Sequence, residues 1–235
     1  MVRGRVRQSD VTCSAGSVQL ASILACVGGM LDAYTYVCRG GVFANAQTGN
    51  IVLFGIAASQ RRWTDALDHI PPILAFIAGV LVAEILRRPK VVLFLRWPVE
   101  AAMMLELSVL ASVGMIPAGA SNVLVSTLIS FTMSVQLSMF RTLGDTAYNS
   151  TLATGNLRTF TQNAYAAVVN KDAAAWRHAI DFGQTIIAFF LGGVAGAWMS
   201  AQWSVRAAWA PAALLLGALV LLIGEQQSLQ RPHRR

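Results

Sequence analysis

Six apolar runs divide this sequence, and each is long enough to cross a membrane as a helix. They lie near residues 17–38, 70–87, 97–116, 121–142, 178–201 and 206–224. A hydrocarbon core of about 30 Å requires about 20 apolar residues in helical form, and an unbroken helix satisfies its own backbone polar groups in lipid. Charged residues make up only 12% of the chain, about half the fraction in a soluble domain. The sequence therefore predicts an all-α integral membrane protein.

Two further segments, 43–60 and 150–170, have helical character but carry many polar side chains. They are either full crossings, which gives eight spans, or re-entrant half-helices, which gives six. Basic residues favour the cytoplasmic side of a membrane protein. With a cytoplasmic N-terminus, the six-span arrangement places fourteen Lys and Arg inside and four outside. Eight spans give ten inside and seven outside, with Arg158 left within the membrane. We therefore expect about six transmembrane helices and two re-entrant or broken half-helices.

The same distribution of charge predicts the domain organisation. Residues 1–16 form a basic cytoplasmic N-terminal segment, residues 17–225 a single membrane domain, and residues 226–235 a basic cytoplasmic tail. Both termini are then cytoplasmic. The tail is short, and anionic lipid of the inner leaflet is the contact that we expect for it.

An internal repeat relates the two halves of the membrane domain, about 17–116 and 121–225. Thr48-Gly49-Asn50 recurs as Thr154-Gly155-Asn156, each time after a long apolar helix. If each half crosses the membrane three times, the halves have opposite orientations. An inverted three-plus-three repeat with discontinuous helices is typical of many secondary transporters.

The residue types of the repeated triplet suit a broken helix at membrane depth. Thr48 and Thr154 are candidates for helix N-caps, and Gly49 and Gly155 permit a ligand or another backbone to approach closely. A helix N-terminus presents free N–H groups and partial positive charge, which favours an anion. The alternative is that each triplet is a cap and turn that only packs two half-helices together.

The residues around the first triplet resemble a known family. Residues 28–36 read Gly-Gly-Met-Leu-Asp-Ala-Tyr-Thr-Tyr and residues 41–52 read Gly-Val-Phe-Ala-Asn-Ala-Gln-Thr-Gly-Asn-Ile-Val. This pattern is similar to the signature of the YoaK-like family, and the stretch from Gln136 through Leu157 resembles that family's second motif. The resemblance implies a multi-pass protein of the bacterial inner membrane with about six spans. It implies no substrate, because none is established for the family.

Two acidic residues lie at membrane depth, where an ionisable group is a candidate functional site. Asp32, in the first span, is either a proton carrier or cation ligand, or a structural carboxylate that bonds hydroxyl groups or caps a break in the helix. Glu106, in the third span, is either a second proton site or the partner of Arg141 or Arg158 in an ion pair.

Arg158 and several amides complete the candidate site. A guanidinium group holds an anion with forked hydrogen bonds, but snorkelling of Arg158 to the inner face or an ion pair with Asp145 is the favoured interpretation. The amide side chains either line a cavity or bond one helix to another. The candidate substrate-binding residues are Asp32, Gln47, Thr48, Gly49, Asn50, Gln136, Thr154, Gly155, Asn156 and Arg158.

Motifs of enzymes, metal sites and nucleic-acid binding are missing from the sequence. The three histidines, His69, His178 and His233, lack the spacing of metal ligands, and there is no phosphate-binding loop or nucleophile elbow. The basic residues are dispersed between the apolar runs and form no single patch. We therefore expect no catalytic residue, metal, cofactor or nucleic-acid partner.

These observations lead to a prediction of function. We expect secondary transport or permeation of a small solute, with Asp32 as the first candidate for coupling to a proton or cation and Glu106 as the second. The half-helix N-termini favour an anionic solute, whereas Asp32 favours a cation. The alternative is a scaffold or accessory subunit of the membrane that transports nothing. The bilayer is the expected partner, and glycine-rich helix surfaces such as Gly192–Gly196 suit a homodimer.

Overall fold

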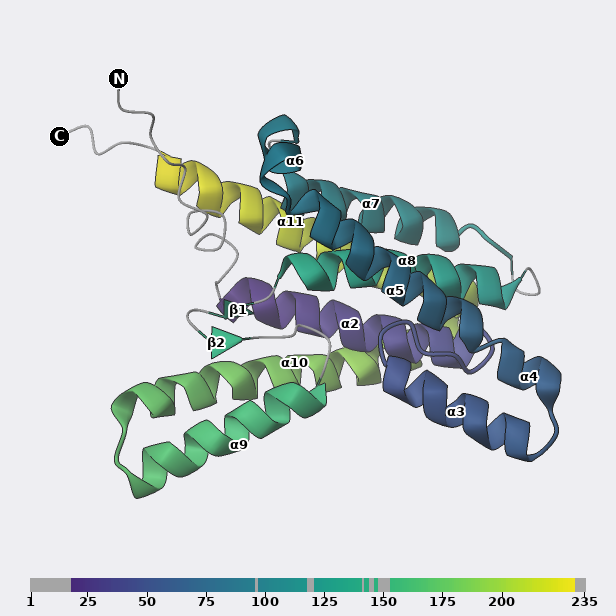
Figure 1. The fold of residues 1–235 in the computed structure, drawn as a ribbon, viewed down its shortest axis with the longest axis horizontal. Coiled ribbons are helices and arrows are strands. Elements are labelled where there is room, and N and C mark those ends of the chain that lie inside the picture. Colours follow the sequence, from purple (N-terminus) through teal and green to yellow (C-terminus); the bar gives the residue numbers. More distant parts are fainter. Residues whose placement is uncertain are drawn as a thin grey trace.

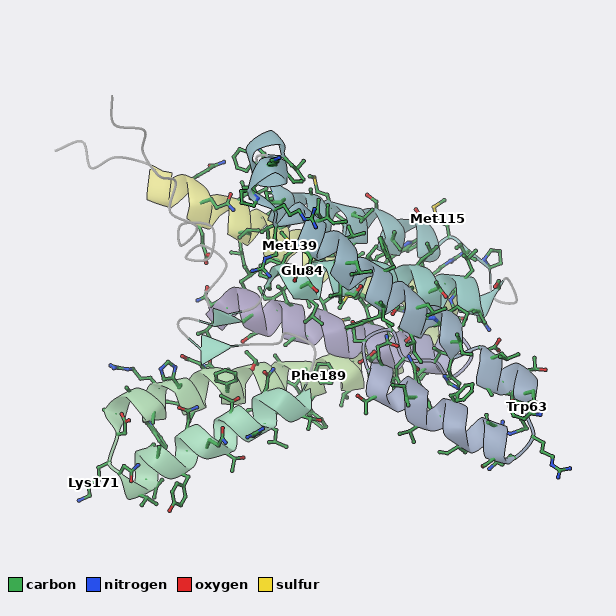
Figure 2. The ribbon with its side chains drawn as sticks, in the orientation of Figure 1. Trp63, Glu84, Met115, Met139, Lys171 and Phe189 are labelled. Atoms are coloured by element: carbon green, nitrogen blue, oxygen red, sulfur yellow. The ribbon has the colours of Figure 1, made fainter. Side chains whose placement is uncertain are left out.

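The computed structural model describes residues 18–95, 97–117, 121–140, 142–143, 146–147 and 153–230. The predicted basic N-terminal segment and the last five residues lie outside the described part. The long helices run roughly side by side, and shorter helices diverge from them (Figure 1). Figure 2 shows the side chains of these helices in the same orientation. The long helices are α2 (Val18–Cys38), α5 (Ile70–Leu86), α7 (Pro98–Val113), α8 (Asn122–Met139), α10 (Ala173–Trp203) and α11 (Trp209–Gln230).

Shorter elements connect these helices. They are α3 (Gln47–Ser59), α4 (Trp63–Leu67), α6 (Pro89–Phe94), α9 (Ala153–Val169), the 3-10 helix η1 (Ser204–Ala208), and two two-residue strands, β1 (Thr142–Leu143) and β2 (Thr146–Ala147). The strands form one short antiparallel pair. Apart from this pair, the regular structure that the described residues form is helical.

The length and composition of the helices confirm the membrane class. Within the described residues, four helical stretches are long and apolar enough to cross a membrane: Val18–Cys38, Trp63–Leu86, Asn122–Met139 and Ala173–Gln227. The last stretch has 55 residues and contains both α10 and α11, which are separated by η1. Helix α7, with 16 residues, is somewhat shorter than the roughly 17 residues that a crossing requires. The helix bounds agree closely with the six apolar runs of the sequence.

The two polar segments are helices that begin near the middle of the molecule. Helices α3 and α9 start close to the centre of the bundle and run outward to opposite ends (Figure 1). Helix α3 has 13 residues, which corresponds to about 20 Å at 1.5 Å per residue. It is therefore too short to cross a hydrocarbon core of about 30 Å.

Glycine residues bring two pairs of helices into backbone contact. Helix α2 packs along α10, and α5 packs along α8. A Cβ atom at Gly192 or Gly196 of α10 would collide with the backbone of α2, at Cys26 or Met30. A Cβ atom at Gly79 of α5 would collide with α8 in the same way. The surface Gly192–Gly196 is therefore used within the chain.

The apolar core lies between α2, α7, α8 and α11. Its fully buried side chains include Leu31, Met103, Ile129 and Leu215. Helix α10, with 31 residues, is about 46 Å long by helical rise, and α9 packs along it. The Asp172 carboxylate caps α10 by accepting hydrogen bonds from the N–H groups of Ala174 and Ala175.

Candidate functional site

The chain reverses direction between α2 and α3, and two glycines make this possible. Gly40 and Gly41 have φ angles of +87° and +76°, which residues other than glycine rarely adopt. The next residues fold back along the end of α2, so that the start of α3 lies beside the middle of that helix. The polar side chains of both elements meet there.

The Asp32 carboxylate binds the backbone of this returning segment. Its Oδ1 atom accepts a hydrogen bond from the Asn45 N–H at 2.8 Å, and the N–H groups of Ala44 and Ala46 also interact with the carboxylate. The Asp32 side chain is buried. A hydroxyl group on the same helix, Thr35 Oγ1, accepts from the Ala44 N–H at 3.1 Å. Asp32 thus provides from a neighbouring helix the negative charge that favours the N-terminus of α3.

Two amide side chains close the segment into a compact hydrogen-bonded loop. Asn50 Oδ1 accepts from the Phe43 N–H at 2.9 Å, and Asn50 Nδ2 donates to the Phe43 carbonyl at 2.8 Å. Asn50 Nδ2 also donates to Gln47 Oε1 at 2.9 Å. Gln47 Nε2 donates to Ser130 Oγ of α8 at 2.9 Å, and Ser130 donates to the Pro72 carbonyl of α5 at 2.8 Å. The first Thr-Gly-Asn segment is therefore connected to α5 and α8 as well as to α2.

The other two members of the first triplet have different roles from those expected. The N-cap of α3 is Ala46, which makes no side-chain cap, so the prediction that Thr48 is the N-cap is wrong. Thr48 lies in the first helical turn with an exposed side chain. Gly49 lies against the Phe43 ring, which a Cβ atom there would meet at 2.9 Å. The absence of a side chain at residue 49 therefore lets the loop pack onto α3.

The second triplet is arranged differently in the described residues. Asn156 is buried, whereas Thr154, Gly155 and Arg158 are exposed on α9. A Cβ atom at Gly155 would meet no atom within 4 Å. The structure therefore brings Asp32, Gln47 and Asn50 together and does not place the exposed members of the second triplet with them. Arg141 and Asp145, which the sequence offered as ion-pair partners, lie outside the described residues.

Glu106 and Gln136 are long polar side chains that are buried in the helix bundle without a partner in the described part of the chain. Both carboxyl oxygens of Glu106, on α7, and both polar atoms of the Gln136 amide, on α8, lack a hydrogen-bond partner among the described residues. Each side chain is fully buried. Glu106 also forms no ion pair with Arg158, because Arg158 is exposed on α9.

Arg39 is a buried residue that sequence analysis counted only as a loop charge. Its Nη2 atom donates to the carbonyl groups of Val113 and Ile116, both at 3.1 Å, at the end of α7. Its Nε atom donates to the Tyr34 hydroxyl at 2.9 Å. A cation is favourable at a helix C-terminus. The sequence feature that could have indicated this buried role is a single arginine placed directly between an apolar span and two glycines.

Replacing Arg39 with methionine is expected to reduce the free energy of unfolding by about 2 kcal/mol, because hydrogen bonds from a charged donor to α7 are lost. Unfolding by SDS in mixed micelles measures this change. The matched control is Arg61→Met, because Arg61 is exposed and should tolerate the change. Equal stability of both variants would show that Arg39 does not hold α2 to α7.

Comparison with known proteins identifies the family. The model of a family described as "Protein of unknown function (DUF1275)" matches residues 20–221. The chain belongs to the DUF1275 family. The match includes both Thr-Gly-Asn segments, Asp32 and Glu106 of this DUF1275 chain. It therefore extends over nearly all of the helices that the structure describes.

A curated relative supports the same assignment. This DUF1275 chain is 30% identical over 153 residues to "UPF0700 transmembrane protein YoaK" of Bacillus subtilis (strain 168), an alignment that covers 63% of the chain and 67% of the relative. The predicted membership of a YoaK-like family is confirmed, and the protein is a multi-pass membrane protein. No solved structure matches the chain. Within the described residues, no group of three or more His, Cys, Asp or Glu side chains could hold a metal ion.

Proposed function

We propose that this DUF1275 protein is a secondary transporter of a small solute in the bacterial inner membrane. The observation that carries the proposal is the Glu106 carboxyl group, which is fully buried in the bundle with no partner for either oxygen in the described structure. A buried charge without a partner is costly, so the group is best accommodated as the neutral acid. A side chain in that state is suited to take up and release a proton.

The surroundings of Glu106 support this role. Helix α7 packs against α8, α11 and η1. Helix α8 carries no charged residue, the one charged residue of α11 is the acidic Glu225, and η1 contributes only the exposed Arg206. These three described elements therefore place no cation beside Glu106 that would hold it permanently ionised. The buried Arg39 also contacts α7, but at the carbonyl groups of Val113 and Ile116, about two helical turns or more from Glu106.

The arrangement of the helices supports an inverted repeat. The first helix of each half packs along a helix of the other half, α2 with α10 and α8 with α5. The first helices also make matching second contacts, α2 with α11 and α8 with α7. Because α2 and α8 run in opposite directions in Figure 1, we propose that the two halves have opposite orientations in the membrane. This is the plan on which alternating access is commonly built.

Within this proposal, Asp32 is a positioning residue, and Glu106 is the coupling residue. The Asp32 carboxylate is already bound to the backbone at the start of α3, where it occupies the position that an anionic solute would take. This arrangement gives no support to an anion at α3. The solute site that we propose is therefore next to the hydrogen-bonded loop and not at the N-terminus of α3.

A second candidate function, a scaffold or accessory subunit, is favoured by one observation. The polar side chains of Asn50 and Gln47 bond mostly to the chain's own backbone and to each other. A loop that is satisfied internally needs no solute to complete it.

Transport by the reconstituted protein tests the proposal. Proteoliposomes with a pH-sensitive dye inside would receive inward gradients of short amines, amino acids or carboxylates, with protein-free liposomes measured in parallel. We expect one class to drive a pH change that needs the protein and is lost in Glu106→Gln. The matched control is Glu84→Gln, because Glu84 is at an exposed helix end, and it should keep the activity.

Two results would contradict the proposal in different ways. If none of the three solute classes drives a pH change in liposomes with verified protein content, the transport proposal is overturned and the accessory subunit is favoured. Proton coupling that persists in Glu106→Gln would leave transport standing and remove Glu106 from the coupling step.

A further inference from the structure

A small pocket lies at the end of the bundle where the loop after α2 meets α3 and α4. Its volume is about 210 Å³, and the residues that line it include Gly41, Ile56, Ala57, Asp68 and His69. Liquid water occupies about 30 Å³ per molecule, so the pocket has room for about seven waters. None of the residues assigned to the solute site from the sequence lines it.

A buried imidazole ring in the wall of the pocket lacks a partner. His69 is 7% exposed, and its Nδ1 atom has no hydrogen-bond partner among the described residues. In the neutral tautomer with the proton on Nε2, Nδ1 is an acceptor. A buried polar atom that is left unpaired reduces stability, and a ligand that donates an N–H group would complete it.

The charges around the pocket leave one carboxylate free. Asp65 forms an ion pair with Arg62, with 2.6 Å between Asp65 Oδ2 and Arg62 Nη1. Asp68 lines the same pocket and forms no ion pair with any described residue. With the Arg62–Asp65 pair neutral overall and His69 uncharged, the pocket has one net negative charge. It is therefore matched to a cation.

The remaining lining restricts the kind of cation. Leu53, Ile56 and Ala57 of α3 provide an apolar wall, which suits a short hydrocarbon chain. No phenylalanine, tyrosine or tryptophan is among the lining residues, whereas quaternary ammonium groups are typically bound by aromatic rings. Asp68 and His69 Nδ1 both accept hydrogen bonds, and the charge of Asp68 favours a donor group that is positively charged, such as an ammonium group.

We propose that this pocket binds a small primary alkylammonium ion. The ammonium group lies between Asp68 and His69, and the alkyl chain contacts the wall formed by α3. The pocket adjoins the hydrogen-bonded loop, because Gly41 lies two residues before Phe43, which Asn50 holds by two hydrogen bonds. One part of this inference rests on the proposed transport function. It is that the solute enters the protein through this pocket, at the end of the bundle where the loop after α2 meets α3 and α4.

Binding to the purified full-length chain in detergent tests this site directly. The probe is pentylammonium chloride, with pentanol as the neutral molecule of the same size, and binding is measured by ligand-observed NMR titration. We expect pentylammonium to bind to the wild type and pentanol to bind at least tenfold more weakly. Asp68→Asn should weaken pentylammonium binding by about tenfold or more, which is the loss expected for a charge-assisted hydrogen bond.

The matched control is Asp172→Asn. It makes the same chemical change at the exposed N-cap of α10, where asparagine caps as well as aspartate, and it should leave binding unchanged. Equal binding of pentanol, or unchanged binding in a folded Asp68→Asn variant, would overturn the site.

The result of the binding experiment can be distinguished from the result of the transport experiment, because binding is measured without a membrane gradient. Binding that depends on Asp68 without amine flux in proteoliposomes would retain the site and reject transport. Flux of another solute without Asp68-dependent binding would retain transport and reject the site.

Discussion

Gly192→Leu is expected to separate α2 from α10 and to be, with Asp32→Leu, one of the two most destabilising substitutions proposed for this protein. Even a Cβ atom at residue 192 would collide with the backbone carbonyl oxygen of Cys26. Backbone atoms cannot move aside as a flexible side chain can, so the two helices would have to shift apart along their whole contact. We expect the free energy of unfolding to fall by about 3 kcal/mol, at the upper end of the range for overpacking.

The control for this prediction lies on α11. A Cβ atom at Gly217 would meet no atom within 4 Å, so Gly217→Leu makes the same change in a transmembrane helix without a collision. The two variants are compared by SDS-induced unfolding and by the fraction that stays monodisperse after heating. If Gly192→Leu is as stable as Gly217→Leu, the close packing of α2 and α10 is incorrect.

Asp32→Leu is expected to release the loop between α2 and α3. The N–H group of Asn45 loses its acceptor, and those of Ala44 and Ala46 lose the carboxylate beside them. An unsatisfied buried group costs about 1–3 kcal/mol, so we expect a loss of about 3 kcal/mol in the free energy of unfolding. Asp32→Asn keeps an acceptor oxygen and should lose only about 1 kcal/mol, because the hydrogen bond is no longer charge-assisted.

Gln136→Leu is the matched comparison, because it also replaces a buried polar side chain in the C-terminal half of the first helix of its repeat half. Both polar atoms of the Gln136 side chain lack a partner among the described residues. Removing an unpaired buried amide leaves no other group unsatisfied, so this variant should be as stable as the wild type or more stable. SDS titration of the three variants measures the difference. A stable Asp32→Leu variant would contradict the positioning role and restore Asp32 as a candidate proton carrier.

The bounds of the long helices could be predicted closely from the sequence. Residues 17–38 were expected as the first span, and α2 is Val18–Cys38; residues 121–142 were expected as the fourth, and α8 is Asn122–Met139. Length and apolar content determine these bounds, because a helix in lipid must satisfy its backbone internally. The polar character of 43–60 and 150–170 likewise marked α3 and α9 as different from the spans.

The partners of the buried polar residues could not be predicted in the same way. Asp32 was expected within the first span and lies in α2, but its bond to the Asn45 N–H depends on the reversal of the chain at Gly40 and Gly41. The sequence favoured a proton carrier or cation ligand and left a structural carboxylate or a cap on a broken helix as the alternative. The tertiary structure places the carboxylate on the backbone of the returning segment. Arg39 is a similar case, since its acceptors at Val113 and Ile116 are more than 70 residues away.

The sequence by itself determined that this protein folds in a membrane and which helices it forms, because both depend on local hydropathy and length. Only the tertiary structure decided which buried polar groups have partners. It pairs Asp32 and Arg39 with distant backbone groups and leaves Glu106 unpaired among the described residues. The physical reason is that hydropathy depends on each residue's own side chain, whereas a hydrogen bond depends on the direction and distance of two groups that the fold brings together.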